Sequence, residues 1–298
     1  MPLVDAAGTS FSYCESGVGA ETLIFMHGYL GASLVWREVL PRFGSRYRCI
    51  AVDARGVGDS ARPAEGYTVD GWTADVLAVA DALDVGRFCY VAHSMGGLTG
   101  YRLALECPDR LSALVLTCPS PAGPPRAGRA AFAPFRAAWA AGDAATMGEL
   151  LASTSVTLPN SSITERRGTL AITAAEGHVD ALLDDAADID LRPGLAAIRT
   201  PTLFVLGAAD PALRTGLADF SLLPNATLDV MSGVGHVPPL ERPAAYADVV
   251  GRFLVEGVVT FRTLLERRPL PPGSALERRP QPPGGALERH PQPPGSAR

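Results

Sequence analysis

The stretch Phe88-Cys89-Tyr90-Val91-Ala92-His93-Ser94-Met95-Gly96-Gly97 decides the fold, because it joins a short apolar run to a helix-like segment through a serine. The apolar run predicts a strand, and residues 98–106 predict a helix. Ser94 stands at the join, with Gly96 two places after it. This is the layout of a nucleophile elbow, a sharp turn that lifts a serine hydroxyl clear of a sheet. Ala92 replaces the usual glycine, and its one extra methyl group is tolerable at such a turn.

The serine needs partners elsewhere in the chain, since an isolated match of this kind more often marks an ordinary strand–turn–helix joint. A serine nucleophile requires a base, usually histidine, and a carboxylate that orients this base. His236 lies on a loop after the last predicted strand and is the preferred base. His93 is expected to point away from the serine, and His27 to brace the loop after an apolar strand. His178 lies in a helical region and His290 in the tail.

The acid must also follow a strand end, and Asp210 does so after the apolar run 201–207. Asp219 falls in a helical stretch and Asp229 inside a strand, so both are expected to face solvent. The chain order is then Ser94, Asp210, His236, which is the serine–acid–histidine order of one large hydrolase fold.

Composition excludes several classes of function. The chain has 298 residues, of which 47% are hydrophobic and 19% charged, as in a soluble globular protein. A net charge of −5, with arginine as the basic side chain throughout, gives no electrostatic case for nucleic acid or an anionic membrane. We expect neither partner, no transmembrane segment and no secretory leader, and hence a cytoplasmic protein. The five cysteines form no C-x-x-C pair, which favours buried free thiols over a metal or redox site.

Strands and helices alternate along most of the chain, which predicts an α/β fold with a mostly parallel sheet flanked by helices. Residues 122–198 break this alternation and carry helical patterns without a convincing strand, so we expect a helical cap. After residue 260 an eleven-residue Pro/Arg repeat predicts a disordered tail, which is either inert or an interaction arm. The predicted division is a core over 1–121 and 199–260, a cap over 122–198, and a low-complexity tail over 261–298. Strands are expected at 9–15, 22–26, 47–52, 88–93, 111–117, 201–207 and 226–231, and core helices at 33–43, 69–83, 98–106 and 240–255.

Residues 20–255 resemble the α/β-hydrolase fold superfamily, in its capped serine-hydrolase type. Four motifs carry the resemblance: His27-Gly28-x-x-Gly31, Asp53-x-Arg55-Gly56-x-Gly58-x-Ser60, the Ser94 elbow, and Gly235-His236 followed by Glu241-Arg242-Pro243. A serine at the elbow counts against the epoxide hydrolases and haloalkane dehalogenases of this fold, which carry aspartate there. The segment His27-Gly28-Tyr29-Leu30-Gly31 and the downstream Trp36 also resemble the menaquinone-pathway lyases of this fold. This resemblance is a minor alternative, because Gly97-Leu98 stands where those lyases are expected to carry a basic residue.

The resemblance implies a serine hydrolase acting through an acyl-enzyme on a small, apolar ester, lactone or thioester. Its catalytic residues would be Ser94, Asp210 and His236, with the backbone N–H groups of Tyr29 and Met95 as the oxyanion hole. The motif around Asp53 is expected to fix a turn rather than to take part in catalysis. The cap residues Phe132, Phe135, Trp139 and Met147 are expected either to line the substrate pocket or to fill the core of the cap.

No metal or organic cofactor is implied, and the partner is a small-molecule substrate, with the oligomeric state left open. The alternatives are a ligand-binding scaffold that does not turn its ligand over, and a lyase, acyltransferase or carbon–carbon hydrolase of the same fold.

Overall fold

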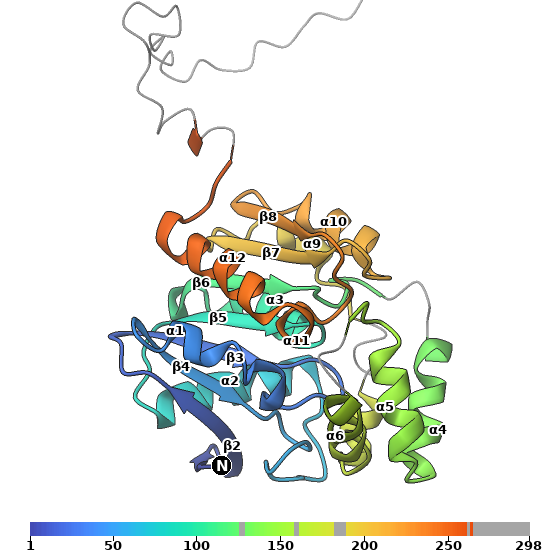
Figure 1. The fold of residues 1–298 in the computed structure, drawn as a ribbon. Coiled ribbons are helices and arrows are strands. Elements are labelled where there is room, and N and C mark those ends of the chain that lie inside the picture. The colour runs from blue at the N-terminus through green and yellow to red at the C-terminus, as the bar shows by residue number, and fades with distance from the viewer. Residues whose placement is uncertain (125–128, 158–160, 182–188, 261–262, 265–298) are drawn as a thin grey trace, which may run out of the picture. The chain divides into compact units, whose positions relative to one another are not determined.

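A single mixed sheet organises residues 1–260 (Figure 1). The structure, a computed structural model, describes residues 1–124, 129–157, 161–181, 189–260 and 263–264. Among these, eight strands pair in the order β1-β2-β4-β3-β5-β6-β7-β8. The first two pairings, β1 with β2 and β2 with β4, are antiparallel, and the others are parallel. The strands are β1 Leu3–Ala6, β2 Thr9–Ser16, β3 Glu21–Met26, β4 Tyr47–Val52, β5 Phe88–His93, β6 Leu111–Thr117, β7 Thr202–Gly207 and β8 Ala226–Met231.

The central strands are buried on both faces, as their continuous apolar runs predict. In β3, Ile24 and Met26 belong to one hydrophobic cluster, whereas Leu23 and Phe25 belong to the other, because side chains alternate across a strand. The first face is covered by α2 Val69–Ala82, α3 Gly96–Glu106 and α10 Leu213–Phe220. The second is covered by η1 Ser33–Trp36, α1 Leu40–Phe43 and α12 Pro243–Glu256. The predicted fold class, a mostly parallel sheet flanked by helices, is confirmed.

Two predicted helices are each divided in two, and proline accounts for the second division. The segment 33–43 forms η1 and the short α1, which carries Pro41 in its first turn. The segment 240–255 forms α11 Pro238–Glu241 and α12, separated at Arg242. Arg242 has φ −144° and ψ 62°, outside the helical region, because the ring of Pro243 disfavours helix in the residue before it.

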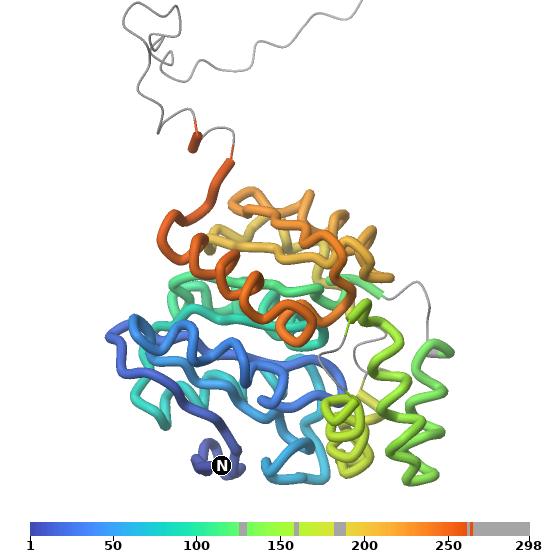
Figure 2. Tube along the Cα trace, viewed as in Figure 1, coloured from blue at the N-terminus to red at the C-terminus, as the bar shows by residue number. Residues whose placement is uncertain are grey.

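After β6 the chain leaves the sheet and returns at β7, and the described residues between them form helices and no strand. Figures 1 and 2 show α4, α5 and α6 gathered at one end of the sheet. Helices α5 and α6 pack so closely that a Cβ atom at Gly168 would lie 2.0 Å from the carbonyl oxygen of Ala144. We refer to the described residues within the predicted range 122–198 as the cap. The cap helices are η3 Arg129–Phe132, α4 Ala133–Ala140, α5 Ala144–Ala152, α6 Ser161–Ile172, α7 Glu176–Asp180 and α9 Arg192–Leu195.

The remaining predictions about organisation stay open or lie outside the described part of the chain. The boundaries predicted for the core and the cap stay predictions. Apart from residues 263–264, the predicted tail 261–298 lies outside the described residues. None of the described helices combines the length and the apolar character that crossing a bilayer would require.

The motif that begins at Asp53 fixes the turn after β4, in the manner expected. The Asp53 carboxylate accepts a hydrogen bond of 2.6 Å from the backbone N–H of Ser33, and the Ser60 hydroxyl donates to the Asp53 carbonyl at 2.6 Å. Gly58 has φ +56°, and a Cβ atom there would lie 2.1 Å from an oxygen of Asp53. Glycine is therefore required at this position for both its backbone conformation and its small size.

Arg55, from the same motif, forms a bidentate ion pair with Asp75 on α2. The Nε–Oδ2 distance is 2.6 Å, and the two side chains are 14% and 8% exposed. Burial raises the pKa of the Asp75 carboxyl by more than the pairing with Arg55 lowers it. The pair thus adds little net stability as a whole, but the loss of one partner would leave the other charge buried and uncompensated.

We therefore predict that Asp75→Asn lowers the free energy of unfolding by about 3 kcal/mol, measured by urea denaturation at neutral pH. The matched control is Asp81→Asn on the same helix, which removes a 66%-exposed partner of Arg110. That change should cost less than about 1 kcal/mol. Equal losses in the two variants would contradict the assignment of a structural role to the buried pair.

Candidate active site

The turn between β5 and α3 holds Ser94 in a left-handed conformation, with φ +51°. Such a conformation is unfavourable for a residue with a side chain and persists only where the surroundings enforce it. The enforcement comes from close backbone packing on two sides. A Cβ atom at Gly96 would lie 2.8 Å from the carbonyl oxygen of His27, and one at Gly97 would lie 2.6 Å from the Cβ atom of Pro119. The predicted elbow is thus present, with glycine where two neighbouring segments leave no space.

Three side chains from separate strand ends meet at this turn. Ser94 follows β5, Asp210 follows β7, and His236 lies on the loop after β8. The His236 Nε2 atom lies 3.0 Å from the Ser94 Oγ, and its Nδ1 atom lies 3.1 Å from each carboxylate oxygen of Asp210. The predicted residues are therefore within hydrogen-bonding distance of one another, in the order serine, histidine, aspartate.

The charge state of Asp210 sets the direction of these hydrogen bonds. Burial opposes ionisation of its carboxyl, but the hydrogen bond and charge of His236 and the N–H of Ala212 outweigh this, so the pKa of Asp210 is lowered. An ionised carboxylate only accepts, so the proton of the imidazole lies on Nδ1. The Nε2 atom of His236 is then left as an acceptor for the Ser94 hydroxyl, which is the arrangement that base-assisted attack by serine requires.

His93 contributes to this geometry in a way that its position in a strand did not reveal. Its Nε2–H donates to the backbone carbonyl of His236 at 2.8 Å, and the centroids of the two imidazole rings lie 5.1 Å apart. Burial, followed by the charge of His236, lowers the pKa of His93 to about 3, so its ring is neutral at physiological pH. His93 thereby fixes the backbone that carries the His236 imidazole.

His27 braces the loop after β3, as expected. Its Nε2 atom accepts from the backbone N–H of Ala54 at 3.0 Å, which leaves its Nδ1–H to donate to the Gly28 carbonyl at 2.8 Å. Burial lowers the pKa of His27, which keeps it in this neutral form. A Cβ atom at Gly28 would lie 2.8 Å from the Cβ atom of Ser94, so this loop runs directly beside the serine.

The backbone N–H groups of Tyr29 and Met95 were the predicted oxyanion donors. Tyr29 lies on the loop that runs beside Ser94, and Met95 is the N-cap residue of α3. Within the described part of the chain, neither N–H donates a hydrogen bond. Both N–H groups are therefore unpaired among the described residues, and their role as oxyanion donors stays a prediction.

Glu241 is the principal residue that the sequence analysis left without a role. Its buried carboxylate accepts from the backbone N–H groups of Gly235 and Val237, at 3.0 and 3.1 Å, on either side of His236. It also accepts from Val156 and Thr157 in the cap, at 2.8 and 3.2 Å. One carboxylate therefore joins the loop of His236 to the cap. The backbone N–H of His236 adds a bond of 2.8 Å to the carbonyl of Thr154.

A cavity of about 330 Å³ opens beside Ser94 and His236. Phe132 and Phe135 line it, as expected, and each packs edge-on against the ring of Tyr29. Trp139 and Met147 do not line it, which corrects the prediction for these two residues. The cavity is lined by Tyr29, His93, Ser94, Pro119, Ser120, Pro121, Ala131, Phe132, Phe135, Leu150, Leu151, Thr154, Arg167, Asp210, Pro211, Ala212, His236 and Val237.

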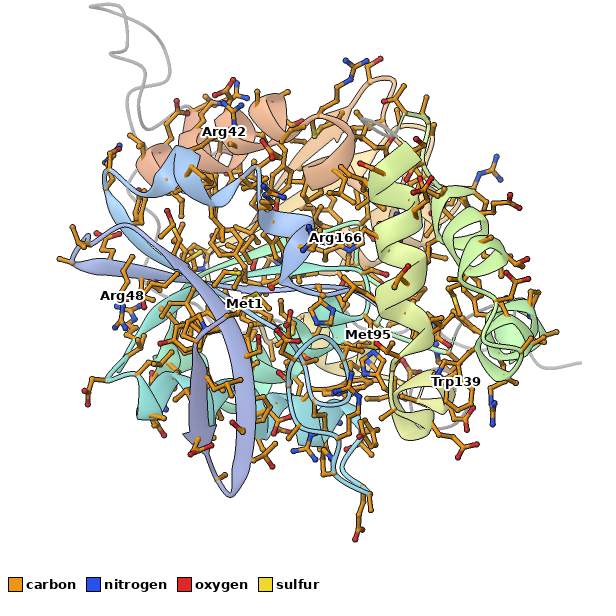
Figure 3. The ribbon with its side chains drawn as sticks, turned by 60° about the horizontal axis from the view of Figure 1, so that its bottom comes forward. Met1, Arg42, Arg48, Met95, Trp139 and Arg166 are labelled. Carbon is orange, nitrogen blue, oxygen red and sulfur yellow. The ribbon has the colours of Figure 1, made fainter. Side chains whose placement is uncertain are left out.

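Contacts within the cap explain why Trp139 and Met147 do not line the cavity. Met147 is fully buried in the hydrophobic cluster that includes the cap. The indole N–H of Trp139, labelled in Figure 3, donates to the Ala174 carbonyl at 2.9 Å, and the Arg136 guanidinium lies 4.7 Å from the centre of its ring. Both side chains therefore pack within the cap, which is the second of the two alternatives given in the sequence analysis.

Asp219 is a second correction, since it is buried rather than solvated. It is 3% exposed, and its carboxylate accepts from the backbone N–H of Ala122 at 2.8 Å, at the start of the cap. Asp229 is partly exposed, as expected, and its Oδ2 atom lies 3.8 Å from the Nη2 atom of Arg252.

Among the described residues, one group combines three atoms of the types that bind metal ions, namely Cys118, Asp210 and His236, within 4.8 Å of one another. The donor set fits a metal ion poorly. Burial raises the pKa of the Cys118 thiol well above its ordinary value, and a protonated thiol is a weak ligand. The two other residues are already engaged with each other.

Comparisons with known proteins identify the family to which this fold belongs. A family model described as the alpha/beta hydrolase fold matches residues 21–243. The 3-oxoadipate enol-lactonase 2 of Acinetobacter baylyi is 29% identical over 252 residues, which cover 82% of this chain and 93% of the relative. The 2-hydroxymuconate semialdehyde hydrolase of Pseudomonas sp. is 31% identical over 285 residues, covering 84% and 92%. The crystal structure of an enol-lactonase from Burkholderia xenovorans superposes with a TM-score of 0.76 at 21% identity, covering 85% of this chain and all of that one.

The bonds of Glu241 predict a measurable loss of stability for Glu241→Gln. An amide has one accepting oxygen where the carboxylate has two, so at least one of the four backbone N–H groups should be left unpaired. We expect the free energy of unfolding to fall by about 2 kcal/mol, with faster hydrogen exchange at one or more of the amides of Gly235, Val237, Val156 and Thr157. Glu149→Gln, at an exposed position of α5, is the matched control and should change neither quantity. Unchanged exchange at all four of the amides bound by Glu241 would contradict this role.

Proposed function

The chain belongs to the alpha/beta hydrolase fold family, and from this premise we propose that it is a serine hydrolase with Ser94 as nucleophile, His236 as base and Asp210 as orienting acid. The observation that carries the proposal is the unbroken line of hydrogen bonds from the Ser94 hydroxyl through His236 to Asp210. The substrate we propose is a small, largely apolar ester, lactone or thioester. The aromatic and aliphatic lining of the cavity supports the apolar part, and relatives named as a lactonase and a hydrolase support the reaction type.

The first half of the proposed reaction is acylation. The Ser94 oxygen attacks the substrate carbonyl while its proton passes to the Nε2 atom of His236. Asp210 stabilises the imidazolium that forms and keeps its ring oriented. The backbone N–H groups of Tyr29 and Met95 hold the oxyanion, and each such donor lowers the barrier by about 3 kcal/mol. The tetrahedral intermediate then collapses as His236 returns the proton to the leaving group.

The second half is hydrolysis of the acyl-enzyme. His236 takes a proton from a water molecule, whose oxygen attacks the acyl carbonyl, and the second tetrahedral intermediate releases the acid. The Ser94 oxygen recovers its proton from His236, so the cycle closes with one water consumed. Every step uses residues of this chain and invokes no metal ion or cofactor.

The serine's role predicts the outcome of Ser94→Ala. Hydrolysis of 4-nitrophenyl acetate should fall by at least about 1,000-fold, and labelling by a fluorophosphonate probe should be lost. Ser120→Ala, at another serine that lines the cavity, is the control and should keep both activities. A wild-type protein that neither labels nor turns over esters would be a binding scaffold. Labelling without acid release would instead indicate an acyltransferase or lyase, to be identified from the products.

The aspartate's role predicts that Asp210→Asn folds normally but turns over slowly. The amide can occupy the same space, but it no longer stabilises a protonated imidazole. We expect kcat to fall by about 10,000-fold with a small change in KM. A loss confined to KM would contradict the proposed role, since it would indicate a contact with the substrate alone.

A further inference from the structure

The lining of the cavity contains one basic side chain, Arg167, that nothing in the proposed reaction uses. It lies on α6 of the cap and is only 8% exposed. It lines the same cavity as Ser94 and His236, and it is close enough to His93 to help lower that residue's pKa. A buried arginine that lines a cavity requires an explanation, because arginine is almost never buried without a partner.

The protein itself neutralises little of this charge. Among the described residues, Arg167 makes a single hydrogen bond, of 3.2 Å, to the backbone carbonyl of Leu151. It forms no ion pair with any described carboxylate. Glu241 acts on it electrostatically, but the carboxylate of Glu241 is occupied by four backbone N–H groups. Most of the five guanidinium donors therefore remain available.

The charge is nevertheless retained on the arginine. Burial lowers the pKa of Arg167 to about 10, which still leaves the guanidinium protonated at physiological pH. An uncompensated buried cation destabilises a folded protein considerably. We expect a protein to retain such a buried cation where an anion from outside the chain binds to it and offsets this cost.

We propose that Arg167 binds a carboxylate group of the substrate, so that the ester, lactone or thioester cleaved at Ser94 carries one acid group at its far end. A planar carboxylate matches the planar guanidinium and can accept two parallel hydrogen bonds from it. This inference rests on the proposed hydrolase function and narrows the class of substrate.

The surroundings favour one negative charge over two. His93 is neutral, so Arg167 supplies the positive charge of the described lining, and the ionised Asp210 lies in the same cavity. A phosphate dianion would meet one cation and one anion there. The apolar side chains of Phe132, Phe135 and Leu150 suit the hydrocarbon segment between the acid group and the reacting carbonyl.

The test uses mono-4-nitrophenyl esters of succinate, glutarate and adipate, each compared with its methyl-capped diester. For at least one chain length the wild-type protein should prefer the free acid by about 10- to 100-fold in kcat/KM, as expected for a hydrogen-bonded charge pair. Arg167→Met should abolish this preference while retaining activity on the capped diester. Arg167→Lys should restore part of it, because the charge returns without the planar geometry.

Arg166→Met is the matched control. Arg166, labelled in Figure 3, precedes Arg167 on α6 but is exposed and does not line the cavity. Its removal subtracts the same charge from the protein and should leave the preference for the acid unchanged. Equal losses in the two methionine variants, or a wild-type protein without preference at any chain length, would overturn the proposal.

A binding measurement separates this proposal from the proposed reaction. Hexanoate should raise the Tm of the wild-type, Ser94→Ala and Arg166→Met proteins but not that of Arg167→Met. Neutral hexanamide should change the Tm of all four proteins equally. A hexanoate shift without ester turnover would support the carboxylate site and reject the hydrolase. Turnover with no Arg167-dependent shift or preference would support the hydrolase and reject the site.

Discussion

The left-handed turn at Ser94 is the constraint on which the rest of the site depends. It persists because two neighbouring segments, at His27-Gly28 and at Pro119, pack closely against residues 94–97. The same close packing places the loop after β3, which carries the unpaired N–H of Tyr29, next to the serine. One local conformation thereby sets both the direction of the hydroxyl and the neighbourhood in which charge would develop during attack.

The sheet and the meeting of Ser94, Asp210 and His236 could be predicted because both follow from short-range patterns. Apolar runs mark buried parallel strands, and residues after the carboxyl ends of such strands converge at one edge. The cap was less predictable. Helical periodicity indicates that Trp139 and Met147 face something apolar, but it does not distinguish a ligand pocket from the cap's own core. Packing between α4, α5 and α6 decides this, and that packing depends on contacts distant in sequence.

Residues that act through backbone groups were the hardest to foresee. His93 binds a backbone C=O group and Glu241 binds backbone N–H groups. Every residue carries such backbone groups, so the sequence does not indicate which of them a side chain will bind. Arg167 presents a related difficulty, since an arginine beside another arginine on an amphipathic helix is usually solvated. Only the fold shows that Arg166 faces outward while Arg167 is enclosed beside the proposed nucleophile.

The bonds from Glu241 and His236 to residues 154–157 have a consequence for how proteins of this architecture can change their substrates. A cap is often regarded as an exchangeable module, inserted between two strands of a conserved scaffold. In this chain, part of the cap supports the loop that carries the proposed base. A foreign cap that replaces residues 154–157 would remove that support. The unit that recombination or design can transplant intact is the cap together with its receiving loop, residues 235–241.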